Sequence, residues 1–283
     1  MTTAPVIDAQ LVKTLREKTN AGLMECKRAL AETNGDLEAA IDVLRKKGAA
    51  SAAKKADREA KDGVIAQAIL PGSKVGVLVE VNCETDFVAK NDSFRAFTDD
   101  IARKIAADPA VDLESERVAA VQKIGENVRI RRSQRVEVTG HGSLAAYIHT
   151  GGKVGVLVEV GADKDETATK EEFKQLVRDI TLQIAAANPV CVDRSQVPAA
   201  LAERERAIYR EQVPAGKPAN IIEKIVEGKM DKFYSGACLI DQAFIKNPDQ
   251  TIAQLIAAKS KELGDTIVIR RFLRYMVGEE ITA

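Results

Sequence analysis

The chain repeats itself, and this internal repeat limits the fold more than any other feature of the sequence. When Gly72 is aligned with Gly151, the segments Gly72–Ala107 and Gly151–Ala186 match at 17 of 36 positions. The octapeptide KVGVLVEV stands intact in both copies, at Lys74–Val81 and Lys153–Val160. Its alternating Val and Leu residues predict a strand. An apolar stretch and a glycine-containing turn precede each copy, which predicts a hairpin.

A second match shows how each copy continues. Ile124–Arg135 resembles Leu263–Arg274, and this alignment needs a larger displacement along the chain than the first one. The second copy therefore resembles the first with a long segment inserted between Ala187 and a helix predicted over Thr251–Leu263. Each copy predicts a hairpin, two helices and a third strand. We therefore expect an α+β fold with two antiparallel subdomains of related design.

The inserted segment predicts a pair of helices. Ala199–Val213 and Asn220–Phe233 have helical patterns, and the turn Pro214–Pro218 between them cannot continue a helix. The two segments therefore predict an antiparallel helical hairpin. Because its apolar stripe is narrow, we expect the hairpin to project as an arm that offers a contact surface.

The N-terminal segment predicts three short helices over residues 8–48, with a break at Asn20–Gly22 and with Gly48 ending the third helix. Residues 49–61 lack an apolar stripe and predict a solvated, partly helical linker. The predicted domains are a three-helix domain with its linker over 1–55, a first core subdomain over 56–141, a second over 142–189 and 250–283, and the arm over 190–249.

Composition excludes several classes of protein. Lys and Arg total 42 and Asp and Glu total 42, so the chain lacks the basic excess of a protein that coats nucleic acid or an anionic membrane. The four Cys form no CxxC pair and there are two His, so we expect no metal site. Scattered Cys are typical of buried thiols in a reducing compartment, which predicts a protein of the cytoplasm, or of the inside of an organelle after processing. No apolar run is long enough to span a membrane.

Sequence motifs of common enzymes are also absent. The chain contains no GxxxxGK[ST] phosphate loop, no GxSxG elbow and no HExxH pair. We therefore expect a binding protein with no catalytic residues and no cofactor.

The two copies differ in the turn between strand and helix. Phe87 and Val88 of the first copy align with Glu166 and Thr167 of the second. If Phe87 filled a core common to both copies, the second copy should keep an apolar residue there. Two interpretations remain open: a staple that packs the following helix, or an exposed knob that enters a partner.

Several motifs resemble those of the translation elongation factor Ts family. They are TDFVAKN at Thr85–Asn91, the N-terminal Leu15–Leu30, IGEN followed by IRR at Ile124–Arg132, and Gly216–Met230. The resemblance covers about Leu11 to Glu279. It implies a ubiquitin-associated-like (UBA-like) three-helix N-terminal domain, a duplicated antiparallel α+β core and a protruding coiled coil.

The resemblance also implies a function. Members of the family are guanine nucleotide exchange factors for the GTPase elongation factor Tu, and their Thr-Asp-Phe-Val segment displaces Mg²⁺ from the nucleotide site of the GTPase. In this chain the segment is Thr85, Asp86, Phe87 and Val88. Removing the ion leaves the GDP diphosphate without its main counter-charge. The resemblance allows a 2:2 assembly with the GTPase, while the zero net charge predicts no direct contact with nucleic acid.

Other residues are weaker candidates for contacts with the GTPase. They are Lys27, Arg28, Lys90, Asn91, Ile124, Gly125 and His149. A solvated helix face accounts equally well for the first two. A structural helix end is as good an explanation of Ile124 and Gly125, because both recur in the second copy as Leu263 and Gly264. His149 also fits an edge strand.

An alternative function uses the strand Arg129–Arg135. Its alternating arginines suit an RNA- or ribosome-binding module, which would bind RNA in a salt-sensitive way. The zero net charge and the similar arginines of the second copy favour a solvated face instead.

Overall fold

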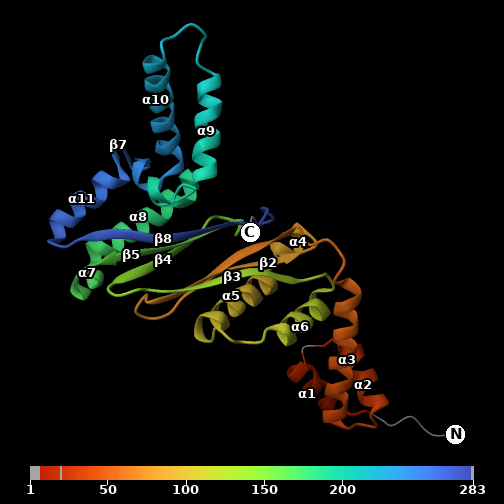
Figure 1. The fold of residues 1–283 in the computed structure, drawn as a ribbon. Helices are drawn as coiled ribbons and strands as arrows, with labels where there is room; N and C mark the ends of the chain where they lie inside the picture. The colour runs from red at the N-terminus through yellow and green to blue at the C-terminus, as the bar shows by residue number, and fades with distance from the viewer. Residues whose placement is uncertain (1–6, 20, 282–283) are drawn as a thin grey trace.

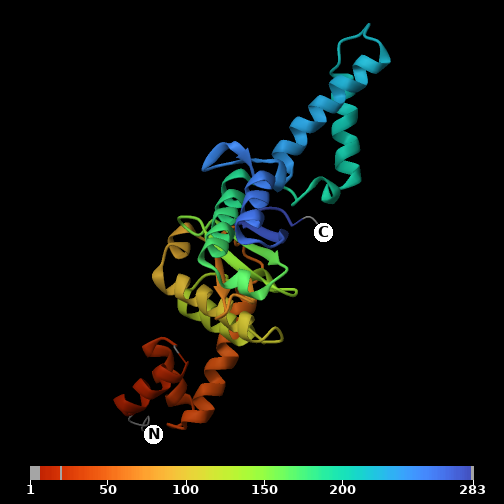
Figure 2. The ribbon, with the colours of Figure 1, turned by 90° about the vertical axis from the view of Figure 1, so that its left-hand side faces the viewer.

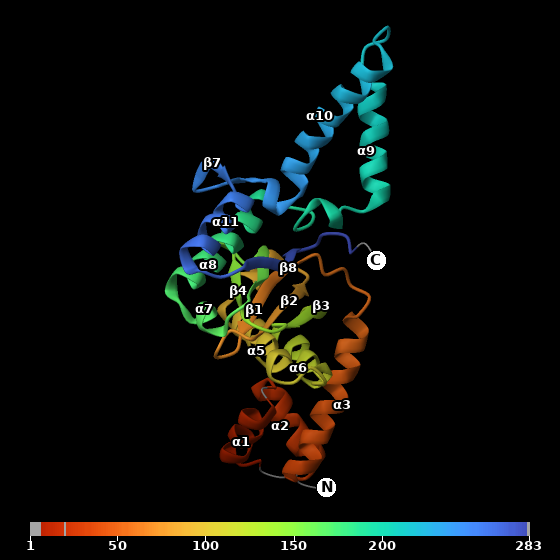
Figure 3. The same cartoon turned by 60° about the vertical axis from the view of Figure 1, so that its left-hand side comes forward.

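The computed structural model describes residues 7–19 and 21–281. Three parts follow one another along its length: a small helical unit near the N-terminus, a body built on two sheets, and a helical hairpin that projects from the far end (Figure 1). Figure 3 shows the same order from a second direction. The mixed α+β fold predicted from the sequence is confirmed.

The N-terminal unit consists of three helices, α1 (Ala9–Thr19), α2 (Leu23–Glu32) and α3 (Leu37–Lys55). Leu15, Leu30 and other fully buried apolar side chains form their common core. Asn20, part of the predicted break between the first two helices, lies outside the described residues.

The predicted end of the third helix at Gly48 is wrong, because α3 continues to Lys55. A Cβ atom at Gly48 would lie 2.8 Å from Gln122 Oε1 and 3.3 Å from Val118 Cγ1, both on α6 (Glu114–Ile124). This glycine therefore lets two helices approach closely. Ala52 is buried in the core of the first subdomain, so part of the predicted solvated linker is packed helix.

The two copies of the repeat have the same architecture. The first contains β1 (Asp62–Ile69), β2 (Val75–Cys83), α4 (Asp86–Ala89), α5 (Asp92–Ala107), α6 and β3 (Arg129–Glu137). The second contains β4 (Gly142–Ile148), β5 (Val154–Ala162), α7 (Asp165–Thr169), α8 (Glu171–Ala187), α11 (Ile252–Leu263) and β8 (Ile267–Met276). The antiparallel sheets have the orders β1-β2-β3 and β4-β5-β8.

Sheet register confirms both alignments found in the sequence. Val75 pairs with Glu137, and Val154 pairs with Met276. Each central strand also has an irregularity at the same place, directly after Glu80 in β2 and directly after Glu159 in β5. The duplication therefore extends to the pairing of individual residues.

The two sheets lie face to face, with helices on their outer sides (Figures 1 and 2). Ile65 and Leu78 of the first sheet meet Leu144 and Leu157 of the second in a cluster between the sheets. On the outer sides, α5 packs Phe94 against the first sheet, and α8 packs the equivalent aromatic ring against the second.

Close approach of the sheets explains a glycine inside each central strand. A Cβ atom at Gly155 would lie 2.4 Å from Ile65 Cγ2 and 3.0 Å from Leu78 Cδ1, both in the other sheet. We expect Gly155→Ala to lower the free energy of unfolding in urea by about 1–3 kcal/mol, as overpacking does. The matched control is Gly228→Ala in a projecting helix, where no atom lies within 4 Å. It should raise stability by up to about 1 kcal/mol, and equal effects of the two substitutions would contradict the packing argument.

The inserted segment forms the predicted pair of helices, α9 (Ala199–Glu211) and α10 (Ala219–Ala237), which project from the body (Figure 2). Short elements flank them: η1 (Arg194–Gln196), η2 (Leu239–Asp241), β6 (Ala243–Phe244) and β7 (Asn247–Thr251). On α9 no side chain is fully buried, while α10 buries Val226 and Met230. The arm therefore has a thin apolar seam and a largely exposed surface.

All four cysteines are buried free thiols, as the sequence predicts. Burial raises the pKa of Cys83 and of Cys238 to about 12, so both stay protonated near neutral pH. Among the described residues, no helix is both long enough and apolar enough to cross a membrane.

Candidate functional site

The site suggested by the sequence is the turn between β2 and α5, where α4 forms a single helical turn. Thr85 caps α4 by accepting a hydrogen bond from the Val88 backbone N–H at 3.4 Å. Phe87 is 81% exposed, more than any other large apolar side chain that the structure describes. A staple would need a buried ring, so that interpretation of Phe87 is wrong and the exposed knob is the observed geometry.

The residues next to Phe87 are anchored differently. Val88 is half-buried and packs against the core of the first subdomain, so it holds the turn and does not extend the knob. In the second copy, Thr167 at the equivalent position is buried, whereas Glu166 is exposed like Phe87. Of the predicted apolar pair, only Phe87 is available to a partner.

A charged pair stands beside the knob. Asp86 Oδ2 accepts a hydrogen bond from Lys90 Nζ at 2.7 Å, and both side chains face solvent. The hydrogen bond from Lys90 lowers the pKa of Asp86, so the carboxylate is charged at neutral pH. The turn therefore presents an aromatic ring next to a formal ion pair.

Three of the weaker candidate residues have clear structural roles: Asn91, Ile124 and Gly125. Asn91 caps α5, because its Oδ1 accepts hydrogen bonds from the Ser93 backbone N–H and hydroxyl, both at 2.8 Å. Ile124 packs against the first core, and Gly125 ends α6 in the left-handed conformation with φ of 86°. Gly264 ends α11 in the same way. The structural explanation of Ile124 and Gly125 is thus confirmed, and a contact role remains a prediction.

Sequence analysis missed Glu126, which ties these segments together. Its Oε2 accepts from the backbone N–H of Glu84 at 2.9 Å and of Thr85 at 3.1 Å, and its Oε1 accepts from Thr85 Oγ1 at 2.7 Å. The predicted site segments around Phe87 and Gly125 are therefore neighbours. The repeat held a signal for this, since Asp265 follows Gly264 as Glu126 follows Gly125.

Lys27 and Arg28 lie far from this turn, on α2 at the N-terminal end of the molecule (Figure 1). Both are exposed, and so are Leu23 and Met24 one helical turn earlier. These four side chains form an exposed apolar and basic surface on α2. The structure does not bring it together with Phe87.

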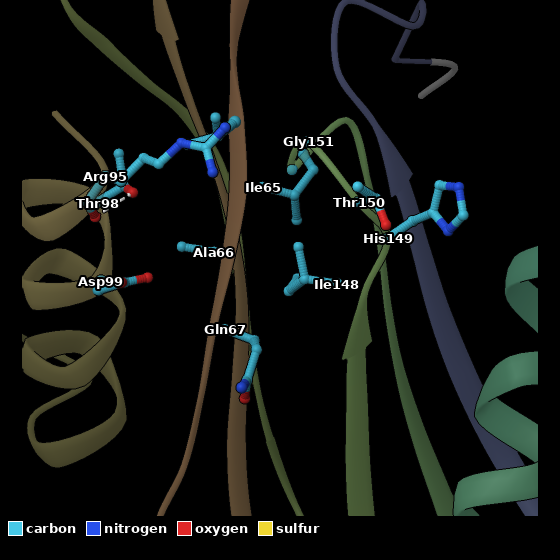
Figure 4. A pocket seen from close by; sticks show the side chains of 12 residues that line it. Ile65, Ala66, Gln67, Arg95, Thr98, Asp99, Ile148, His149, Thr150 and Gly151 are labelled. Carbon is cyan, nitrogen blue, oxygen red and sulfur yellow. Dashed lines mark hydrogen bonds between the residues drawn. The ribbon is translucent and has the colours of Figure 1, made fainter. Parts of the chain in front are cut away.

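His149 also lies apart, at the end of β4. Its Nδ1 is 3.0 Å from the Tyr147 hydroxyl. A cavity of about 330 Å³ runs between α5, β1 and the turn after β4 and is lined in part by Arg95, Asp99 and His149. Figure 4 shows the imidazole turned away from α5, while Arg95 reaches toward β1. The imidazole of His149 is therefore exposed to solvent and does not fill this cavity.

Of the β3 arginines that the sequence predicts as a solvated face, Arg129 is exposed, but Arg131 and Arg132 are partly buried and held by a carboxylate. Glu80 is fully buried, and its carboxylate accepts from Arg131 Nη1 at 3.0 Å and from Arg132 Nε at 2.7 Å. Glu159 holds Arg270 and Arg271 in the same way in the second copy. Three of the four arginines behind the RNA-binding alternative thus pair with carboxylates of this chain, Arg131 and Arg132 with Glu80 and Arg135 with Glu137. Within the described residues no group of His, Cys, Asp and Glu could hold a metal ion.

Comparison with known proteins gives a consistent result. Residues 84–279 match the family model described as Elongation factor TS. The chain is 43% identical to elongation factor Ts of Clostridium novyi, over 97% of this chain and 94% of that protein. It is 42% identical to elongation factor Ts of Lawsonia intracellularis, over 97% and 99% of the two chains. It is 43% identical to elongation factor Ts of Thioalkalivibrio sulfidiphilus, over 97% and 93%.

Proposed function

The chain belongs to the elongation factor Ts family, and from this membership we propose that it is a guanine nucleotide exchange factor for the GTPase elongation factor Tu. The observation that carries the proposal is the exposed Phe87 on a turn that the rest of the protein holds in place. Aromatic side chains are enriched in the buried core of protein–protein interfaces, so an exposed ring on a fixed turn supports a role in binding a partner.

In the proposed mechanism, Thr85, Asp86, Phe87 and Val88 form the segment that disturbs the magnesium site of the GTPase. Phe87 enters the nucleotide-binding domain, Asp86 brings its negative charge beside it, and Thr85 and Val88 fix the turn. Displacing Mg²⁺ removes the largest local positive charge from the GDP phosphates. Because the factor binds the nucleotide-free GTPase more tightly, GDP must bind the complex more weakly by the same factor. No covalent bond changes in this reaction.

We also propose the finer features that family membership implies. Helices α1–α3 would be the UBA-like domain and α9–α10 the coiled-coil arm, with the four domain ranges predicted from the sequence. The α2 surface with Lys27 and Arg28, and the exposed His149, would contact the GTPase beyond its nucleotide site. Lys90, Asn91, Ile124 and Gly125 would line the contact around the knob. The protein would act in the cytoplasm, where translation takes place.

Co-purification tests the proposed partner. A tagged form of the chain should retain elongation factor Tu when nucleotide is removed, and excess GDP should release it, because the two ligands oppose each other. Light scattering of the nucleotide-free complex distinguishes a 1:1 from a 2:2 assembly. Retention that GDP does not change would contradict an exchange mechanism.

A further inference from the structure

We propose that Glu126 is a positioning residue for exchange, because it holds the Thr85–Val88 turn so that Phe87 is presented in one orientation. This inference rests on the proposed exchange function. Glu126 itself lies behind the turn and is tied to its backbone, so it acts through Phe87.

The hydrogen bonds form one continuous path from α6 to the knob. Glu126 follows Gly125, the left-handed residue that ends α6, so its backbone is fixed by that helix. Its carboxylate accepts from the Thr85 backbone and hydroxyl. The same hydroxyl oxygen accepts from the backbone N–H of Val88. One carboxylate therefore sets the residues on both sides of Phe87.

A second set of bonds runs in the opposite direction. Glu84 Oε1 accepts from the backbone N–H of Asn127 at 2.6 Å, while the backbone N–H of Glu84 donates to Glu126. Asn127 is fully buried, and its Nδ2 donates to the carbonyl oxygen of Arg58 at 2.7 Å. Hydrogen bonds in both directions therefore join the segment at Glu84 to the segment at Glu126 and Asn127. Asn127 in turn bonds to the segment that precedes β1.

The turn that carries Phe87 needs these hydrogen bonds because it is not stable by itself. Helix α4 has only four residues, and an isolated helical turn is unstable in water. The exposed ring of Phe87 makes no core contact that would fix it. A partner that binds a disordered turn must order it first, and this lowers affinity and rate, whereas a preorganised turn avoids that cost.

The second copy of the repeat supplies the comparison. Asp265 accepts from the backbone N–H groups of Asp163 at 3.2 Å and Lys164 at 3.1 Å, as Glu126 does in the first copy. That turn carries Glu166 where the first carries Phe87. The carboxylate clamp thus belongs to the fold of both copies, and only in the first does it hold an aromatic knob.

The test measures release of a fluorescent GDP analogue from elongation factor Tu by the full-length factor over a range of factor concentrations. Glu126→Gln keeps the side-chain volume but removes the charge and one acceptor oxygen. We expect it to lower the maximal release rate about threefold to tenfold. The matched control Asp265→Asn should change the rate less than about twofold. In the Phe87→Ala background, Glu126→Gln should cause no further loss, since Glu126 acts through the ring.

The outcomes separate this inference from the proposed function. If Phe87→Ala slows release and Glu126→Gln does not, or if the two losses multiply independently, the positioning role is refuted and the exchange function stands. If Phe87→Ala leaves release unchanged, the proposed role of Phe87 in exchange is refuted, and the positioning role of Glu126 is refuted with it. If Glu126→Gln does not fold, the isosteric pair Glu126→Asp and Glu126→Asn replaces it. An aspartate is long enough for this role in the second copy, where Asp265 holds the equivalent turn. Asp should then keep most of the activity and Asn should lose it, and equal activities would refute the inference.

Discussion

Replacing Phe87 with alanine is expected to slow the release of GDP from elongation factor Tu by at least about tenfold at a fixed concentration of the factor. Burial of a phenylalanine side chain in a partner contributes about 1.5–3 kcal/mol, and each 1.4 kcal/mol corresponds to about a factor of ten. Phe87 is the exposed ring of the site, so its truncation removes this contribution directly. Stopped-flow fluorescence of a labelled GDP analogue measures the effect.

The internal repeat provides the control for this experiment. Glu166→Ala alters the equivalent position of the second copy, which is also solvent-exposed, and should leave release unchanged. Phe87→Ala should also leave the free energy of unfolding within about 0.5 kcal/mol of the wild type, because the ring is not part of a core. A variant that unfolds more easily, or that releases GDP at the wild-type rate, would show that the ring has another role.

Most of the two-sheet body could be predicted from the sequence because the chain contains two copies of the same structural unit, which can be compared with each other. Aligning Gly72 with Gly151 matches the hairpins and first helices, and aligning Ile124 with Leu263 matches the last strands. Both alignments reappear as paired residues in the sheets. The same comparison indicates that Phe87 is exposed, because the aligned residue of the second copy is Glu166, which cannot fill a core.

The features that sequence analysis missed depend on contacts between distant segments. Gly48 has the chemistry of a helix end, but the approach of α6 requires a glycine within a continuing helix. The arginines of β3 alternate like a solvated strand, but the partner of Arg131 and Arg132 is Glu80, which lies much earlier in the chain, inside an apolar run. Glu126 could be linked to Thr85 only after the two segments were placed side by side. Periodicity describes which face a residue occupies, not which distant group meets it.

The two buried glutamates, Glu80 and Glu159, also join the two subdomains, because each bonds to the backbone of the other subdomain. Glu80 of the first copy accepts from the backbone N–H of Gly278, which follows the last strand of the second copy, at 3.0 Å. Glu159 of the second copy accepts from the backbone N–H of Thr139, which follows the last strand of the first copy, at 2.9 Å. Each carboxylate therefore holds two arginines of its own sheet and the segment that follows the last strand of the other subdomain.

Glu80→Gln is accordingly expected to lower the free energy of unfolding by about 3 kcal/mol, since breaking a buried ion pair from one side leaves the other charges uncompensated. Urea unfolding measures the loss. Glu159→Gln should cost a similar amount, because Glu159 is buried and has equivalent partners. The control is Glu223→Gln on the arm, where the Arg210–Glu223 pair is 2.7 Å long and each side chain is 52% exposed. An exposed pair of this kind contributes at most about 1 kcal/mol, and a control that costs as much as Glu80→Gln would refute the burial argument.

The pH dependence of this loss separates charge from shape. Burial tends to raise the pKa of Glu80, but the hydrogen bonds from Gly278, Asn82 and Arg131 outweigh it, so its pKa is lowered in the folded chain. The stabilisation is therefore fully present above the unfolded pKa of about 4.3 and is lost as the pH falls through the lower folded pKa. Below about pH 4.3 the wild type should lose stability more steeply than Glu80→Gln, and the difference between them should narrow. If that difference stays constant down to about pH 3, the lost stability comes from the shape of the side chain and not from its charge.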